Sequence, residues 1–227
     1  MFAERVSFDG ELLSRISFGS TSEEFLDQNF GERTFHDTVY VNANVYFSKF
    51  GLDQDETFHA AIDLLDDWDE ELEIAHPETV TEAAKSAHEQ YPNKRVIVHY
   101  MQPHLPFIGE RGLEIRERLG IRNGWIPFRQ GDISVTVGEL WEGYNENLEI
   151  AFDYVDDLLS EIDGRVVLSA DHGNMVDERQ CPLPTKRMSM FGHPWEVYTE
   201  ELVKVPWFVI GDDRRTITEE PPVTEQG

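Results

Sequence analysis

The sequence predicts an α/β fold in which a largely parallel sheet is sandwiched between helices. Three short apolar runs, at residues 38–47, 94–101 and 165–170, have the composition of strands, and the last suits a strand buried on both faces. Helices are predicted over residues 77–91, which open with Pro77 and Glu78, and over residues 138–162, where apolar residues recur at helical spacing; both alternate with these runs. Alternating strands and helices are typical of a parallel α/β sandwich.

The length of the chain predicts one large domain. With 227 residues, of which 40% are hydrophobic, the chain can bury a sizeable core. We place this domain at residues 1–215. A polar tail is predicted for residues 216–227, which include two consecutive prolines. The sequence contains no internal repeat.

The chain is strongly acidic. Its 19 Lys and Arg face 45 Asp and Glu, which gives a net charge of -26. Such a surface repels nucleic acid and anionic membranes. The acid is spread along the whole chain, which favours adaptation to a cytoplasm of very high salt over an acidic partner-binding face. The charge also repels an anionic substrate, so a site for one needs a metal or local cations.

Cysteine usage and hydropathy predict a cytoplasmic protein. The single Cys181 excludes an internal disulfide framework and fits a reducing compartment. No apolar run of about 18 residues occurs, so no membrane span is predicted. The first six residues lack the pattern of a signal peptide. The oligomeric state is left open.

Four other stretches complete the expected layout. We predict no strand in residues 1–16 and an acidic helix over residues 55–72. Residues 110–136 are predicted to form a charged, irregular insertion, whose aromatic cluster either lines an access cleft or makes a satellite core. After His172 we expect a polar loop with little regular structure, and then a last strand over residues 204–211.

Two metal-competent side chains follow the run at residues 165–170. Asp171 and His172 come directly after it, and Gly173 is next. In open α/β sheets, ligands gather at the carboxyl ends of strands. Asp and His suit Zn²⁺ or Mn²⁺, and a second carboxylate would complete three or four ligands. The alternative is that Asp171 caps a helix beside an incidental histidine.

Two further histidines lie on constrained loops. His104 is flanked by two prolines just after the run at residues 94–101, and His193 stands between a glycine and a proline. Because loops at strand ends carry sites, we expect both near Asp171 and His172. His99, inside the predicted strand, is interpreted as a satisfied core or interface histidine.

A hydroxyl cluster precedes the first predicted helix. Ser20, Thr21 and Ser22 are followed by Glu23 and Glu24, and this spacing spells a capping box. A helix cap alone explains the pattern. The functional alternative is that one hydroxyl is a nucleophile, because N–H groups at a helix N-terminus suit attack on a phosphate or sulfate ester.

Taken together, these segments resemble the alkaline phosphatase/sulfatase superfamily. The resemblance rests on Ser-Ala-Asp-His-Gly ending at Gly173, on the His-x-x-Gln-Pro-His-x-Pro run ending at Pro106, and on Phe-Gly-His193 before Val-Pro-Trp207. It covers residues 17–211 and is strongest to sulfatase-like proteins of halophilic archaea. It implies a three-layer αβα sandwich that hydrolyses or transfers small sulfate or phosphate esters with a divalent metal: Zn, Mn, Ca or Mg.

The resemblance also implies roles for individual residues. Asp171 and His172 would be metal ligands, His104 would contact the ester anion, and His193 would lie near the metal or the leaving group. The segment from Gly19 to Phe25 is similar to the nucleophile segment of the lipoteichoic acid synthase branch. That similarity points to Thr21 as the nucleophile, with Ser22 and Ser20 as alternates. The Cys-x-Pro-x-Arg motif of formylglycine sulfatases does not occur.

Two departures from the family pattern leave two functions open. Family members begin with an apolar strand that ends in an acidic metal ligand, and here Met1 falls after the expected place of that strand. Asn174 stands where many relatives have Glu. The sequence therefore predicts either a metal-dependent ester hydrolase or transferase, or an inactive, truncated relative of the same fold that acts as a binding module.

Overall fold

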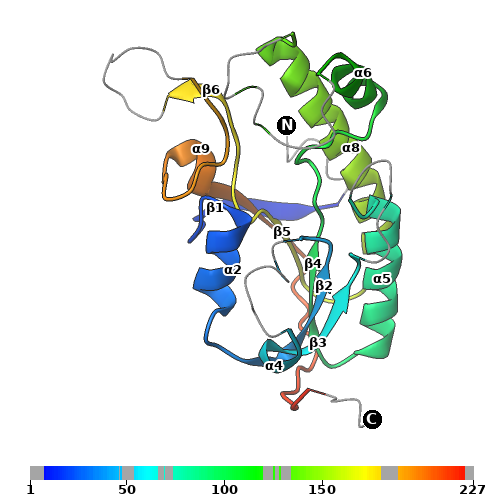
Figure 1. Cartoon of the computed structure of the whole chain (residues 1–227). Helices are drawn as coiled ribbons and strands as arrows, with labels where there is room; N and C mark the ends of the chain where they lie inside the picture. The colour runs from blue at the N-terminus through cyan, green and yellow to red at the C-terminus, as the bar shows by residue number, and fades with distance from the viewer. Residues whose placement is uncertain are drawn as a thin grey trace.

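The computed structural model describes residues 8–45, 47, 54–65, 69, 74–119, 125, 128, 134–179 and 189–222. Cys181 and parts of the predicted insertion lie outside these residues. The chain is mixed α/β, and its described strands form three small sheets (Figure 1). One of these sheets is parallel and the other two are antiparallel, so the described strands confirm the α/β class.

The parallel sheet has the strand order β3 (Phe58–Asp63), β2 (Phe35–Asn42) and β4 (Arg95–His99). β2 is central and pairs with both neighbours in parallel. The strands predicted at residues 38–47 and 94–101 are therefore confirmed. Because all three strands run the same way, their carboxyl ends lie at one edge of the sheet.

Helices cover both faces of β2. Val39 and Val41 pack with Val80 of helix α5 (Pro77–Gln90) in one buried cluster. Tyr40 points the other way and packs with Leu26 of helix α2 (Ser22–Phe30). Successive side chains of a strand point to opposite faces, which explains this division. Figure 1 shows α5 on one side of the parallel sheet and α2 on the other.

Two more helices build the wall beside α5. Helix α8 (Val137–Glu161) begins with a capping box at Thr136 and contacts both α5 and helix α6 (Glu110–Leu119). Trp125 and Phe128 are buried in a cluster with Phe107 and other apolar residues, which supports the satellite-core interpretation of the aromatic segment. Among the described helices, none is long and apolar enough to cross a membrane.

A second sheet is antiparallel, with the order β1 (Gly10–Ile16), β8 (Lys204–Ile210) and β5 (Val166–Ser169). β5 and β8 are predicted strands that the structure confirms. β5 is only partly buried, with alternating intermediate and exposed residues, so the expectation of a strand buried on both faces is wrong. Among the described strands β5 pairs only with β8, so it is an edge strand of this sheet, and it exposes some of its residues.

The remaining elements are short. Strands β6 (Met175–Arg179) and β7 (Ser189–Gly192) form a two-stranded antiparallel sheet in the stretch predicted to be a polar loop. Helix α9 (Glu200–Val203) leads into β8, and helix α4 (Gln54–Thr57) leads into β3. The predicted irregular insertion begins with the regular helix α6.

Two sequence predictions failed because tertiary pairing overrode local pattern. The helix predicted over residues 55–72 is instead α4 followed by β3, which pairs with β2. Apolar residues four apart satisfy both helical and strand periodicity, so the pattern was ambiguous. In residues 1–16, where no strand was predicted, β1 pairs with β8 along its whole length. Because every residue of β1 is exposed, no buried face requires apolar residues at alternate positions, and its sequence lacks that strand signal.

We expect the aromatic cluster between α2 and the parallel sheet to contribute strongly to the stability of the fold. Phe58 is fully buried, and its ring centroid lies 5.3 Å from that of Phe30 and 5.1 Å from that of Tyr40. We expect Phe58→Ala to lower the free energy of unfolding by about 3–5 kcal/mol, measured by denaturant titration. The control Leu113→Ala removes a half-exposed side chain of α6 and should cost less than about 1 kcal/mol. Similar losses for both variants would contradict this packing.

Candidate functional site

The candidate site lies where three strands end. His99 is the last residue of β4, Asn44 follows β2, and Asp171 follows β5. The Nε2 atom of His99 lies 3.7 Å from Oδ2 of Asp171 and 3.4 Å from Nδ2 of Asn44. The two three-stranded sheets therefore contribute to one polar cluster, as the predicted gathering at strand ends requires.

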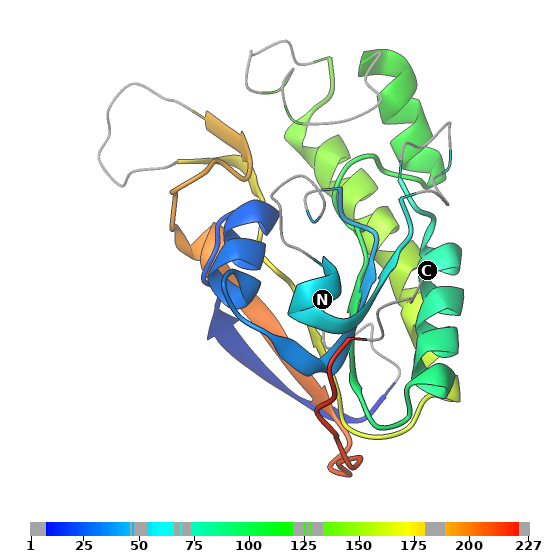
Figure 2. The same cartoon turned by 60° about the horizontal axis from the view of Figure 1, so that its bottom comes forward.

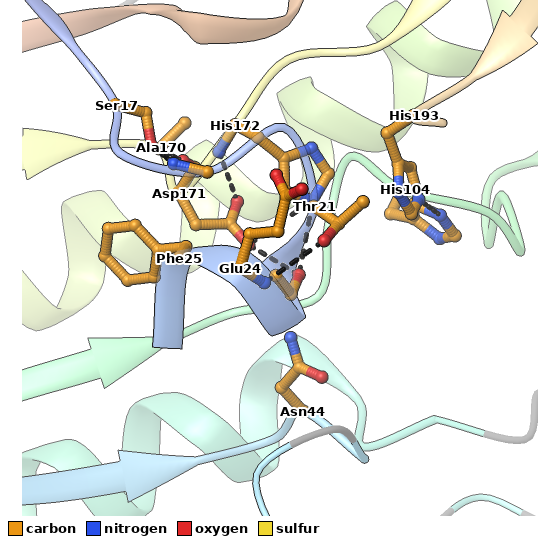
Figure 3. Close-up of polar contacts among 12 residues, drawn as sticks. Ser17, Thr21, Glu24, Phe25, Asn44, His104, Ala170, Asp171, His172 and His193 are labelled. Atoms are coloured by element: carbon orange, nitrogen blue, oxygen red, sulfur yellow. Dashed lines mark hydrogen bonds and ion pairs between the residues drawn. The ribbon is translucent and has the colours of Figure 1, made fainter. Parts of the chain in front are cut away.

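The N-terminus of α2 joins this cluster. The Ser22 hydroxyl donates to Oδ2 of Asp171 at 2.6 Å, and its oxygen lies 3.2 Å from Nε2 of His172. Ser17, on the segment between β1 and α2, donates from its hydroxyl to the Asp171 carbonyl. Figure 3 shows the start of α2 against Asp171 and His172. Residues about 150 positions apart are thus in direct contact.

Around His172 and Ser22, the hydrogen-bond acceptors outnumber the hydrogens available to them. Its Nδ1 lies 2.7 Å from the carbonyl oxygen of Gly173, which can only accept, so Nδ1 carries a hydrogen. The single hydroxyl hydrogen of Ser22 faces two acceptors, the Asp171 carboxylate and Nε2 of a neutral His172. One added positive charge, either a proton on Nε2 or a cation, satisfies the arrangement.

Asp171 is held as a partly buried carboxylate. Burial alone raises the pKa of a carboxyl group, but here His172, His99 and the Ser22 hydroxyl together bring the Asp171 pKa well below its ordinary value. The backbone N–H of His172 also donates to Oδ1 at 2.8 Å. Asp171 therefore presents a negative charge at the centre of the cluster.

His99 and Tyr40 belong to the cluster, although the sequence analysis assigned neither of them a site role. The Tyr40 hydroxyl lies 2.7 Å from Nδ1 of His99. Burial, together with the charge of Asp171, raises the pKa of Tyr40, and burial lowers the pKa of His99. The sequence feature that could have identified His99 as a site residue was its position at the end of a predicted strand that is followed by His104.

The three hydroxyls of the cluster have different surroundings. Ser20 is fully buried, and its Oγ contacts Oε2 of Glu24 at 2.8 Å and the carbonyl oxygen of Pro194 at 3.0 Å. Thr21 is the N-cap of α2, where its Oγ1 accepts from the Glu24 N–H at 3.2 Å, and it is partly exposed. Ser22 is buried against Asp171.

Glu24 anchors the hydroxyl segment, a role beyond the cap that the sequence predicted. One carboxylate oxygen accepts from the Ser20 N–H at 2.7 Å, and the other accepts from the Glu196 N–H at 2.8 Å. The Tyr198 hydroxyl donates to that second oxygen at 3.3 Å. Burial raises the pKa of Glu24, but these hydrogen bonds outweigh it and lower the pKa. Glu24 thus ties α2 to residues 194–198.

His104 and His193 form a pair beside the cluster. Their Nε2 atoms are 3.0 Å apart, and the His193 ring centroid lies 4.4 Å from that of His172. Nδ1 of His104 lies 2.6 Å from the Leu105 carbonyl and carries a hydrogen, so in its neutral form Nε2 accepts from His193. Burial lowers the pKa of His104, which favours that neutral form. The expected proximity of His104, His172 and His193 is thus observed.

Helix α8 holds the loop that carries His104. Asn147 is fully buried, its side-chain amide donates to the His104 carbonyl at 3.1 Å, and its oxygen accepts from the Ile108 N–H at 3.0 Å. The ring centroid of Trp125 lies 6.3 Å from that of His104. The position of His104 is therefore fixed by packing and by hydrogen bonds from another element.

Two glycines allow close backbone contacts around the site. A Cβ atom at Gly173 would lie 2.0 Å from the Glu201 carbonyl oxygen, and one at Gly19 would lie 2.3 Å from the Phe25 nitrogen. Gly173 donates its N–H to the Leu202 carbonyl at 2.7 Å. The glycine after Asp171 and His172 is thus required by the chain that passes behind the site.

The side chains that could hold a metal ion lie around Asp171. Asp171 and His172 offer a carboxylate oxygen and a ring nitrogen beside the Ser22 hydroxyl. Within the described ranges, no group of three or more His, Cys, Asp or Glu side chains is arranged to hold a metal ion. Catalytic zinc usually has three protein ligands. The described residues therefore do not form a closed set of metal ligands.

Comparisons with known proteins add no assignment. No protein-family model matches the chain, and no curated protein sequence matches it. The resemblance to the alkaline phosphatase/sulfatase superfamily stays a prediction.

The anchoring role of Glu24 predicts a pH-dependent stability contribution. Because its folded-state pKa is lowered, the ionised carboxylate stabilises the fold above its ordinary value of 4.5, and this stabilisation is lost as the pH falls through the lowered value. We expect Glu24→Gln to cost about 1–3 kcal/mol near neutral pH and progressively less in acid, measured by denaturant titration.

Glu23 supplies the matched control for Glu24→Gln. Burial, Glu24 and Asp27 raise the pKa of Glu23, so its charge opposes folding. Glu23→Gln should therefore leave stability near neutral pH unchanged or slightly higher. A Glu24→Gln cost that does not shrink in acid would show that the charge of Glu24 is not what stabilises the segment.

Proposed function

We propose that this protein hydrolyses or transfers small phosphate or sulfate esters, using a hydroxyl at the N-terminus of α2 as the nucleophile. One observation carries the proposal: the hydroxyl segment of α2 lies against Asp171 and His172, because the Ser22 hydroxyl donates to Asp171 and its oxygen lies 3.2 Å from Nε2 of His172. A helix cap alone needs neither residue. Nucleophile, acid–base group and carboxylate within hydrogen-bond reach are the parts that such catalysis combines.

Thr21 is the proposed nucleophile. It is partly exposed, whereas Ser20 and Ser22 are buried and bonded to Glu24 and Asp171. Its Oγ1 sits at the positive end of the helix, where N–H groups favour a developing alkoxide. In the proposed reaction Thr21 Oγ1 bonds to phosphorus or sulfur while the bond to the leaving oxygen breaks. The hydroxyl proton of Thr21 is transferred in balance to the leaving oxygen, which departs as an alcohol or phenol. Water or an acceptor hydroxyl then cleaves the threonyl ester.

The neighbouring residues suit the handling of protons and the anion. His172 and the Asp171 carboxylate are acceptors one residue away from Thr21, at the Ser22 hydroxyl. The His104–His193 pair lies on the other side of Thr21 in the view of Figure 3, and its rings can donate to ester oxygens only by exchanging the hydrogen bonds that they make to each other and to the Leu105 carbonyl. The N–H groups at the helix N-terminus offset part of the net charge of -26 that an anionic ester meets.

A divalent metal, Zn, Mn, Ca or Mg, is part of the proposal. It would be held by Asp171 and His172, with His193 close to His172, and would supply positive charge for the ester oxygens. The excess of acceptors at the Ser22 hydroxyl supports a cation there. The set still needs a further ligand beyond Asp171 and His172.

The finer fold proposal concerns the arrangement of the sheets. We infer that the two three-stranded sheets belong to one sheet of a three-layer αβα sandwich. Among the described strands, β4 and β5 each have a partner on one side. The end of β4 is next to the end of β5, where His99 approaches Asp171. The ends of β2, β4 and β5 would then lie at one edge of that sheet, where the polar cluster lies.

Substitutions in the hydroxyl segment test the proposal by turnover. In high salt with Mn²⁺ or Zn²⁺, the protein should cleave a nitrophenyl phosphate or sulfate. We expect Thr21→Ala to lower kcat by a factor on the order of 10³ or more, and Thr21→Ser to retain activity because it keeps the hydroxyl. Ser22→Ala should lower activity less, because Ser22 orients Asp171.

The same assay can overturn the choice of nucleophile. Loss of turnover in Ser22→Ala with full activity in Thr21→Ala would assign the nucleophile to Ser22. Full activity in both variants would exclude this segment from the reaction. A melting curve for each variant separates loss of chemistry from loss of the fold, since Thr21 and Ser22 both lie at the start of α2.

Metal binding is expected independently of turnover. Calorimetric titration with Mn²⁺ should give a binding isotherm that Asp171→Asn weakens by at least about tenfold, because the charged ligand is lost. Asp163→Asn, at an exposed carboxylate that follows α8, is the matched control and should leave the affinity unchanged. Equal affinity of the Asp171→Asn variant and the original protein would refute the proposed metal role.

A binding module of the same fold is the second candidate. It is favoured by the absence of a closed set of three ligands among the described residues. Such a protein would bind phosphate or sulfate without turning over any ester. Its proposed location is cytoplasmic in either case, on the ground that one cysteine fits a reducing compartment.

A further inference from the structure

The outer edge of β1 is an unusual surface. All seven residues, Gly10–Ile16, are exposed. One side of β1 pairs with β8, and no other described strand pairs with it. Figure 2 shows β1 in dark blue at the outer margin of the molecule beside β8. A long exposed edge with apolar side chains is a template for another strand.

We propose that two copies of this chain associate by pairing β1 with β1 in antiparallel orientation, about a two-fold axis at Leu13. Identical edges related by a two-fold axis always pair antiparallel. The result is a continuous sheet of six strands, in the order β5-β8-β1 from one copy followed by β1-β8-β5 from its partner. The proposal is independent of the proposed function.

The charges of β1 select this register. With Leu13 on the axis, Glu11 of one copy faces the partner's Arg15, and Arg15 faces the partner's Glu11. Opposite charges directly across an antiparallel pair stabilise it, and like charges destabilise it. β1 itself carries one acid and one base, so it is neutral in a chain of net charge -26.

The apolar side chains of this face continue across the same axis. Leu13, 38% exposed, pairs with Trp207 of β8, and Arg15 lies over the Trp207 ring at 5.4 Å. The partner's Leu13 would extend this into a row of Trp207, Leu13, the partner's Leu13 and the partner's Trp207. On the opposite face, Leu12 and Ile16 are 44% and 67% exposed and become partly covered.

Salt should strengthen this association. Two copies of charge -26 repel each other at long range, and ions screen that repulsion over a Debye length of about 8 Å at physiological ionic strength. The interface is a single strand edge, so the dimer should be weak and dissociate on dilution. We expect the dimer at protein concentrations of about 10–100 μM in high salt, and the monomer at low concentration or low salt.

Charge-swapped variants test the register by analytical ultracentrifugation of the full chain. The two-fold axis creates two facing pairs, each between position 11 of one copy and position 15 of the other. Glu11→Arg makes both pairs positive against positive, and Arg15→Glu makes both pairs negative against negative. Each variant alone should therefore be monomeric. An equimolar mixture of the two single variants should restore the dimer, because every facing pair is again opposite in charge. The double variant Glu11→Arg/Arg15→Glu should also dimerise.

Cysteine cross-linking tests the axis itself. In a Cys181→Ser background, Leu13→Cys should form an intermolecular disulfide under mild oxidation, because facing residues of an antiparallel pair lie within disulfide range. Leu12→Cys is the matched control. Leu12 faces the partner's Ser14 in this register, so its thiols stay too far apart to cross-link.

Three outcomes would overturn the proposal. A protein that is monomeric at all concentrations and salts has no such interface. A dimer that persists unchanged in Glu11→Arg uses another surface. Cross-linking of Leu12→Cys in preference to Leu13→Cys would place the axis elsewhere. Circular dichroism melts verify that each variant folds, which is expected because these side chains are exposed.

Discussion

The hydrogen bond between the Ser22 hydroxyl and the Asp171 carboxylate is the contact on which the candidate site depends. It joins the start of α2, which packs on the parallel sheet, to the end of β5, which belongs to the antiparallel sheet. Asp171 is partly buried, and a carboxylate withdrawn from water without partners is costly. The cluster of Ser22, His172 and His99 around Asp171 offsets that cost and fixes the relative position of the two sheets.

The position of β1 links this site to the proposed dimer. β1 ends at Ile16, and Ser17 then donates to the Asp171 carbonyl before α2 begins. The segment between β1 and Thr21, the proposed nucleophile, is therefore short and bonded to the end of β5. Within one copy, β1 is already held by β8 along its whole length, and a second copy would add pairing at the outer edge of the same strand.

The sequence predicted the parts of the site that local pattern reveals. Asp171, His172 and the hydroxyls of α2 stand beside recognisable strand ends and caps, and the structure brings them together. It could not reveal Glu24 as an anchor, because its partners Glu196 and Tyr198 are distant in the chain. β1 and β3 were missed for a related reason: strand pairing with β8 and β2, not local periodicity, determines them.

Detection of a covalent intermediate on Thr21 tests the central claim most directly. The protein is mixed with a nitrophenyl phosphate or sulfate and quenched in acid, and the peptide containing residues 20–22 is analysed by mass spectrometry. The account predicts one phosphoryl or sulfuryl group on Thr21, absent from Thr21→Ala. Turnover without any modified peptide, or with the group on a residue outside this segment, would contradict a nucleophile at the start of α2.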